Sequence, residues 1–221
     1  MKQPGLTSRL IATVILAVGF VAMTMAVTAG MFTAIDLQVA DAMHSAWRPD
    51  LHPLFQAIAE LGGIELTSLL MLGLVVYIIR AGFGSDAWVF LAFVIAVVLE
   101  LVYKSVLHHP GPPGSLSQAD GPSLSSLLSG TGGGNSFPSG HVVRTVIAYG
   151  LLAFVVRRLS PSPVMRLLSL VGVVVLFVVM AFDRMYLDVH WESDVIGGLL
   201  LGGIGLLAGT VWLDRPRKVR R

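Results

Sequence analysis

The sequence predicts an all-α, polytopic membrane protein in which six transmembrane helices form one bundle and both termini are cytoplasmic. Composition is the first observation. Of the 221 residues, 55% are hydrophobic and 13% are charged, whereas about 25% of an ordinary soluble domain is charged. A water-soluble fold of this size has no interior large enough for that much apolar surface. The other two observations are the apolar runs and the distribution of basic residues.

Six apolar runs approach the length of about 20 residues that a transmembrane helix needs. The first run follows Lys2 and Arg9, but it is longer than the apolar part of a signal peptide, so we expect a retained helix. The fourth run is short and has to include residues before it. Within a single domain of residues 1–221, the expected helices cover residues 10–32, 64–80, 87–104, 140–156, 165–183 and 193–213.

The basic residues predict the orientation in the cell membrane. If the helices cross alternately, 11 of the 15 Lys and Arg residues share one side, because the other side holds only Arg48, Lys104, Arg144 and Arg184. The positive-inside rule assigns the richer side to the cytoplasm. All six histidines then lie on the outer side, where we expect the chemistry. The net charge of +2 does not indicate a nucleic-acid partner, because the basic residues sit in short clusters beside apolar runs.

Three further segments leave alternatives open. Apolar residues recur at helical spacing over 36–47, which indicates a helix that lies on the membrane surface or packs over the bundle. Residues 105–137 are rich in Gly, Ser and Pro and predict a flexible outer loop, either a lid or a plain connector. The last helix carries small residues four apart, which suit packing inside the bundle or a homodimer. These are Gly198, Gly202, Gly205 and Gly209.

Polar residues gather at three predicted outer helix ends. Glu100 precedes Lys104 by four residues and shares its helical face, so the two form either a helix-end anchor or an oriented phosphate-binding lysine. Ser139 and Gly140 precede the fourth helix, where free backbone N–H groups and the helix dipole favour an anion. His141 follows in the first turn of that helix.

The third polar segment joins the fifth and sixth helices. His190 and Asp194 are four residues apart and share a face. A carboxylate behind an imidazole fixes its tautomer and leaves the other ring nitrogen as a nucleophile or base. Arg184 has the geometry to bind a phosphoryl group through two N–H groups. Because a bundle brings helix ends together, all three segments are expected to surround one phosphoryl group in transit.

These segments resemble the three sequence blocks of the type 2 phosphatidic acid phosphatase superfamily: Lys-x6-Arg-Pro, Pro-Ser-Gly-His and Ser-Arg-x5-His-x3-Asp. This chain has Lys104-x6-Gly111-Pro112, then Pro138-Ser139-Gly140-His141, then Asp183-Arg184-x5-His190-x3-Asp194. The second block is complete. The third departs only at Asp183, and the first has Gly111 in place of its arginine.

The resemblance implies a role for each matching residue. His190 is expected to form a phospho-histidine, Asp194 to hold it, and His141 to protonate the leaving oxygen and then activate water. Lys104, Arg184 and the Ser139-Gly140 segment are expected to bind the phosphate oxygens. No metal or cofactor is expected. Asp188 and Glu192, which lie near this site in the sequence, are expected to be orienting or solvated.

The implied activity is hydrolysis of a lipid phosphate or pyrophosphate at the outer membrane face. The candidate substrates are undecaprenyl pyrophosphate, phosphatidylglycerol phosphate and phosphatidic acid. The alternatives are a lipid phosphotransferase and a non-catalytic lipid-binding or transport protein on the same scaffold.

The missing arginine of the first block leads to a separate hypothesis. Arg144 lies three residues after His141 on the same helical face. It either reaches back to the membrane surface or points into the site and binds phosphate in place of the lost cation. His108 and His109 are further candidates in the loop, although ordinary histidines are mostly neutral at pH 7.

Overall fold

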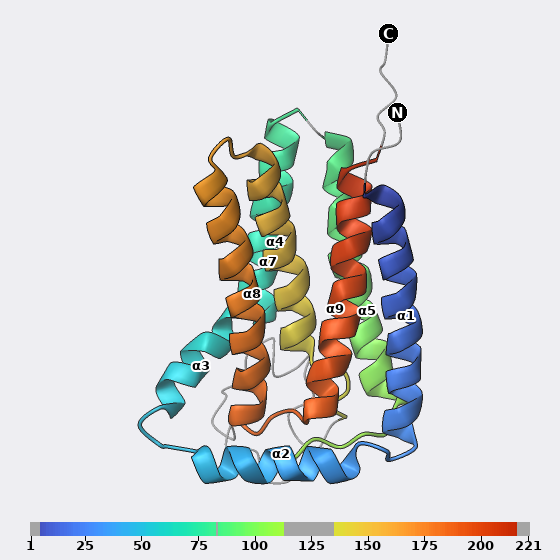
Figure 1. Cartoon of the computed structure of the whole chain (residues 1–221), viewed down its shortest axis with the longest axis vertical. Coiled ribbons are helices and arrows are strands. Elements are labelled where there is room, and N and C mark those ends of the chain that lie inside the picture. Colours follow the sequence, from blue (N-terminus) through green and yellow to red (C-terminus); the bar gives the residue numbers. More distant parts are fainter. Residues whose placement is uncertain (1–4, 83, 113–134, 216–221) are drawn as a thin grey trace.

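The computed structural model describes residues 5–82, 84–112 and 135–215, which form a bundle of long helices (Figure 1). The helices are α1 (Leu6–Thr28), α2 (Thr33–Ala46), α3 (His52–Leu61), α4 (Ile64–Arg80), the 3-10 helix η1 (Gly84–Val89), α5 (Phe90–Val106), α7 (Gly140–Leu159), α8 (Pro163–Tyr186) and α9 (Glu192–Leu213). The all-α prediction is confirmed. Most of the predicted flexible loop 105–137 lies outside the described residues.

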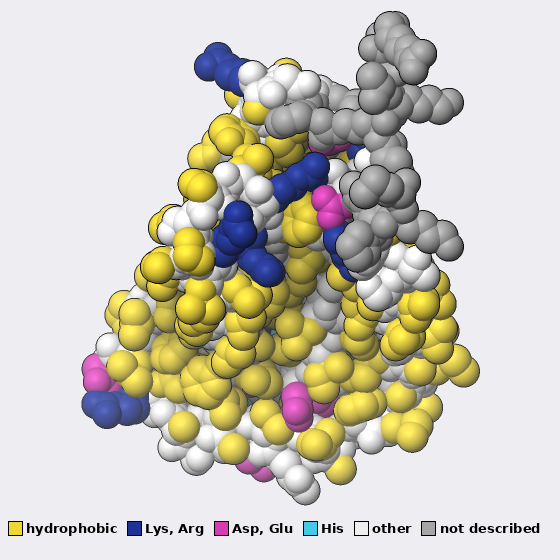
Figure 2. Space-filling view, turned by 45° about the horizontal axis from the view of Figure 1, so that its top comes forward, with side chains coloured by type: hydrophobic (Ala, Val, Ile, Leu, Met, Phe, Trp, Pro, Cys, Tyr) yellow, Lys and Arg dark blue, Asp and Glu magenta, His cyan; other side chains and the backbone are white. Residues whose placement is uncertain are grey.

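Five described helical segments are long and apolar enough to cross a membrane. They are Leu6–Thr28, His52–Arg80, Asp86–Val106, Pro163–Tyr186 and Glu192–Leu213. Large apolar side chains on the sides of the bundle are open, with Val14, Leu69 and Val178 exposed by 63%, 65% and 64%. Figure 2 shows hydrophobic side chains over the visible sides of the bundle. Exposure of so large an apolar surface to water is unfavourable, whereas the hydrocarbon core of a membrane would solvate it. The chain is therefore an integral membrane protein.

The helix α7 differs from the other long helices because it is the buried centre of the bundle. It packs against α4, α5, α8 and α9, and most of its first half is buried. It contains Arg144, Arg157 and Arg158 and is not among the five segments apolar enough to span. Neighbouring helices shield α7, so it does not need the apolar surface that lipid contact demands.

The glycines of α9 let that helix approach α7 closely. A Cβ atom added at Gly198, Gly202, Gly205 or Gly209 would come within 2.6–2.8 Å of an atom of Ser139 or of an α7 side chain. All four glycines therefore face the inside of the bundle. The alternative was that these small residues form a homodimer contact, but none of the four positions is exposed on the surface of the bundle.

The helix α2 lies across one end of the bundle, roughly perpendicular to the long helices (Figure 1). It packs on α8 and α9, and its buried Asp36 accepts hydrogen bonds from the backbone N–H (2.9 Å) and hydroxyl (2.8 Å) of Ser193. The predicted helix over 36–47 therefore packs over the bundle. The start of α1 and the end of α9 lie at the opposite end. The short helix α3, which was not expected, leads into α4 through Gly62 and Gly63.

Candidate functional site

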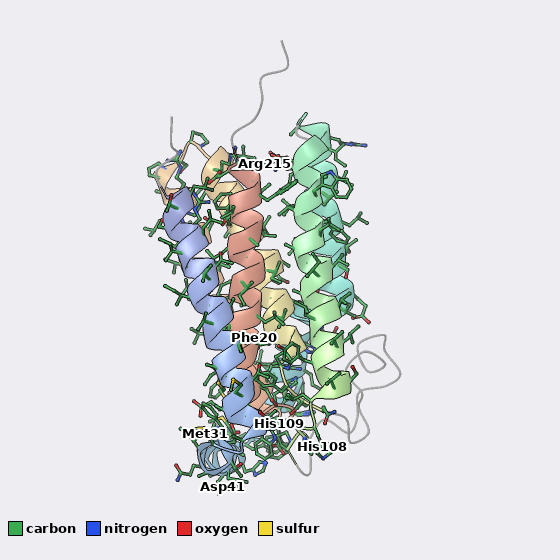
Figure 3. The ribbon with its side chains drawn as sticks, turned by 90° about the vertical axis from the view of Figure 1, so that its right-hand side faces the viewer. Phe20, Met31, Asp41, His108, His109 and Arg215 are labelled. Carbon is green, nitrogen blue, oxygen red and sulfur yellow. The ribbon has the colours of Figure 1, made fainter. Side chains whose placement is uncertain are left out.

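The three polar segments meet at the end of the bundle that α2 covers. Lys104 lies in the last turn of α5, His141 in the first turn of α7 and Arg184 in the last turn of α8, and His190 precedes α9. The charged side chains of Lys104 and Arg184 and the ring of His190 lie close enough to His141 to act on it electrostatically. Figure 3 places His109 at this end of the molecule and Arg215 at the other. The bundle therefore brings together the residues that the sequence predicts for one site.

His190 and Asp194 form the predicted pair. The Nδ1 atom of His190 lies 3.3 Å from Oδ2 of Asp194, which also accepts a 2.9 Å hydrogen bond from the backbone N–H of Trp191. Asp194 is fully buried. Burial lowers the pKa of His190 and outweighs the opposing hydrogen bond and charge of Asp194. His190 is therefore neutral at pH 7, and with its proton on Nδ1 toward Asp194, Nε2 keeps a free lone pair.

Glu100 joins two cations from different helices. Its carboxylate accepts hydrogen bonds from Lys104 Nζ at 3.1 Å and from Arg144 Nη1 at 2.9 Å, and only 1% of the residue is exposed. The group links α5 to α7, so it is more than an anchor for one helix end. One carboxylate offsets one of the two positive charges, and the fixed arrangement leaves a net positive charge beside His141.

Arg144 lies within the site and does not reach back to the membrane surface. Its guanidinium is buried and donates from Nε to the carbonyl oxygen of Gly62 at 3.1 Å. Its Nη2 atom lies 3.4 Å from Nδ1 of His141. An arginine N–H only donates, so Nδ1 of His141 accepts and the ring proton sits on Nε2.

Arg184 is held by the residue that departs from the third family block. Its Nε and Nη2 atoms donate to Oδ2 of Asp183 at 2.8 and 2.5 Å, and both side chains are buried. The serine expected at this position would bring no charge. The carboxylate of Asp183 orients the guanidinium and offsets part of its charge, because the two are an ion pair.

The N-terminus of α7 supplies groups for an anion. The hydroxyl oxygen of Ser139 is buried and has no hydrogen-bond partner among the described residues. The backbone N–H of Ser139 donates to the carbonyl of Asp194 at 3.0 Å, which joins α7 to α9. A buried hydroxyl without a partner costs free energy, so this orphaned group beside a helix N-terminus fits a phosphate oxygen.

Gly140 leaves room for the Glu100 carboxylate, because a Cβ atom at position 140 would overlap that carboxylate. We expect Gly140→Ala to displace Glu100 and lower kcat/KM at least tenfold, about 1.4 kcal/mol, with a lower thermal midpoint. Gly73→Ala is the matched control, since a Cβ there meets nothing within 4 Å. Steady-state rates and thermal unfolding of both variants check this expectation, and a fully active Gly140→Ala would contradict it.

The other acidic residues near the site have distinct surroundings. Asp188, expected to be orienting or solvated, is 2% exposed and its Oδ2 lies 2.9 Å from Nε2 of His44 on α2. Glu192 is partly exposed at the start of α9. Sequence reasoning missed Asp36, whose bonds to Ser193 bring its charge near Asp194. The sequence did carry a signal for it: an acidic residue on an otherwise apolar helical face indicates a buried carboxylate that needs a hydrogen-bond partner.

Position 111 has space for the side chain that the first block lacks. A Cβ atom at Gly111 would make ordinary contacts, 3.5 Å from Cβ of Ser136 and 3.8 Å from the carbonyl oxygen of Val189. Val189 immediately precedes His190. The missing arginine is therefore not excluded by crowding of the backbone.

Comparisons with known proteins found matches to a family model, to curated proteins and to a solved structure. The chain matches the PAP2 superfamily model over residues 22–218. It is 43% identical over 86 residues to "Putative undecaprenyl-diphosphatase YbjG" of Escherichia coli (strain K12), which is 38% of this chain and 39% of that protein. It is 35% identical over 68 residues to "Phosphatidylglycerophosphatase B" of Bacillus subtilis (strain 168), or 30% and 34% of the two chains. The matched segments thus span little more than a third of these curated relatives.

A solved structure shares the fold over almost the whole chain. The crystal structure of a transmembrane PAP2-type phosphatidylglycerolphosphate phosphatase from Bacillus subtilis superposes with a TM-score of 0.79 at 20% sequence identity. The match covers 94% of this chain and 98% of that one.

Proposed function

Because this chain belongs to the PAP2 superfamily, we propose that it is an integral membrane phosphatase that hydrolyses a lipid phosphate or pyrophosphate through a phospho-histidine. The observation that carries the proposal is the buried His190–Asp194 pair, which shares one end of the bundle with His141, Lys104 and Arg184. A neutral imidazole with a free Nε2, a second imidazole and fixed cations are the groups that a double displacement at phosphorus needs.

In the first step, the phosphate oxygens bind to Lys104, Arg184, the Ser139 hydroxyl and the N–H groups that begin α7 with Gly140. The Nε2 lone pair of His190 attacks phosphorus while the bond from phosphorus to the lipid oxygen breaks. His141 acts as the acid when both of its ring nitrogens carry a proton, a state that the negative phosphate beside it stabilises; it gives its Nε2 proton to that leaving oxygen and becomes a neutral imidazole with a free Nε2 lone pair. Asp194 stabilises the positive charge that develops on the His190 ring.

In the second step, His141 takes a proton from water as the water oxygen attacks phosphorus. The bond between phosphorus and Nε2 of His190 breaks and inorganic phosphate leaves. Glu100 keeps Lys104 in place, and Arg144, whose Nη2 atom lies beside His141, adds positive charge for the phosphate oxygens. No step uses a metal ion or cofactor.

The proposal includes six membrane crossings, with α7 as the sixth. Because α7 runs alongside the spanning helices, it crosses the membrane with them. Its last turn contains Arg157 and Arg158, and the positive-inside rule places such a basic helix end in the cytoplasm. Both termini are then cytoplasmic, and the site faces the outer leaflet, where a lipid headgroup reaches it from the bilayer rim.

The absence of cysteine from the chain makes this topology directly testable. We expect Asp50→Cys, exposed between α2 and α3, to react with a membrane-impermeant thiol reagent in intact cells. We expect Ser8→Cys, exposed at the start of α1, to react only after lysis. The reverse pattern would overturn the outer-face site.

The substrate class is tested with the purified protein in detergent micelles. We expect inorganic phosphate to be released from undecaprenyl pyrophosphate, phosphatidylglycerol phosphate or phosphatidic acid, with His190→Ala as the blank. Release from water-soluble phosphate esters only would contradict a lipid phosphatase. A new phospholipid in place of free phosphate would instead identify a phosphotransferase.

A further inference from the structure

The carboxylate of Asp194 lies between two histidines, and only one of them belongs to the family blocks. Oδ2 faces Nδ1 of His190, while Oδ1 lies 3.4 Å from Nε2 of His109. His109 precedes Gly111 by two residues, inside the block that lacks its arginine. We propose that His109 is a positioning residue: it fixes Asp194 behind His190 and supplies the first block with a positive charge. This inference rests on the proposed phosphatase function.

The backbone of His109 is held on both sides. Its N–H donates to the side-chain oxygen of Asn135 at 2.9 Å, and its carbonyl accepts from the backbone N–H (2.8 Å) and the hydroxyl (3.1 Å) of Ser136. The indole N–H of Trp191 donates to the carbonyl of Pro110 at 2.8 Å. The segment that carries His109 is thus tied to residues next to His190 and just before α7. A fixed segment gives the ring a fixed direction, as positioning requires.

Charge also favours contact between His109 and Asp194. Burial alone would lower the pKa of His109, but the Asp194 contact and charge, with the charge of Asp36, outweigh burial and raise it. The charged or titratable groups that face His109 are Asp194 on α9, Asp36 on α2 and, beyond the shared carboxylate, His190. Because its pKa is raised, the ion pair with Asp194 is fully present below the ordinary histidine range and is lost as pH rises through the raised value.

The contact matters to catalysis because Asp194 is fully buried. Without His109, Oδ1 would lose its 3.4 Å ion-pair contact, and among the described residues one contact fewer would define the plane of the carboxylate. His190 takes its tautomer and direction from that plane. Residues that orient a metal-binding histidine from behind change activity by about 10- to 100-fold, and we expect an effect of that size for the residue that orients Asp194.

The test compares three variants with the wild type. His109→Ala should lower kcat at least tenfold while KM stays within twofold. His109→Gln retains a neutral donor and should keep at least a third of the wild-type kcat at its optimum. His108→Ala is the matched control, because this neighbouring residue is exposed, and it should behave as wild type.

The pH profile separates positioning from simple structural support. Wild-type kcat should fall as pH rises above the ordinary histidine range, where His109 loses its proton, and His109→Gln should lack this fall. The inference is overturned if His109→Ala matches His108→Ala, or if His109→Gln keeps the wild-type pH profile. An inactive wild type would instead overturn the proposed function. If His109→Ala does not fold, the profile of His109→Gln alone decides.

Discussion

His190→Ala is expected to abolish turnover, lowering kcat by at least about a thousandfold. The nucleophile is the group whose loss no neighbour replaces. In the proposed mechanism His141 serves as the acid and then the base, and its Nδ1 atom contacts Arg144, so it does not take over the attack on phosphorus. Rates of phosphate release from purified protein, with protein amount matched by absorbance, measure the loss.

The same experiment tests metal independence. An excess of EDTA is expected to leave the wild-type rate unchanged, because Lys104 and Arg184 provide the positive charge that a metal ion would otherwise bring. His108→Ala controls for the removal of a histidine as such. Activity that is lost in EDTA and returns with magnesium would contradict the metal-free mechanism.

Arg144→Ala is expected to lower kcat/KM at least tenfold, about 1.4 kcal/mol of transition-state stabilisation. The guanidinium contacts the carboxylate of Glu100, the carbonyl of Gly62 and the ring of His141. Without this guanidinium, the negative charge of Glu100 offsets the positive charge of Lys104 in full. Lys104 then attracts the phosphate less strongly. Arg144→Lys should recover little, because a single ammonium group does not span three partners.

A double variant separates the charge of Arg144 from its contacts. Adding Gly111→Arg to Arg144→Ala is expected to restore part of the rate, since position 111 has room for a side chain beside the carbonyl of Val189. Initial rates over a range of substrate concentrations give kcat/KM for each protein. If Arg144→Ala keeps wild-type kinetics, Arg144 is only an anchor and the compensation hypothesis is wrong.

Much of the site could be predicted because its residues lie at helix ends with defined spacing. The spacing of four places Glu100 with Lys104 and His190 with Asp194, and the structure has both pairs in contact. Helical periodicity is local, so contacts between residues four apart are readable from sequence alone. The roles assigned to these residues in catalysis are a separate matter and stay predictions.

The contacts between distant segments were not predictable. His109 meets Asp194, and Asp36 meets Ser193, across 85 and 157 positions of the chain. Such contacts depend on how a loop and a surface helix fold over the bundle, which no periodicity encodes. Arg144 was ambiguous for the same reason, because its partner Glu100 lies on another helix. Hydropathy also gave too weak a prediction for α7 as a membrane span. This helix lies at the centre of the bundle, so it does not need an apolar surface toward lipid.

The most direct test of the central claim is to trap the phosphorylated protein. Wild-type protein is mixed with substrate labelled in the phosphate, quenched in alkali within the first turnovers, and digested for peptide mapping. The account predicts an alkali-stable, acid-labile phosphate on the peptide that contains His190, and none in His190→Ala. Phosphate on another residue, or full turnover with no trapped phosphoenzyme under conditions that slow hydrolysis, would contradict it.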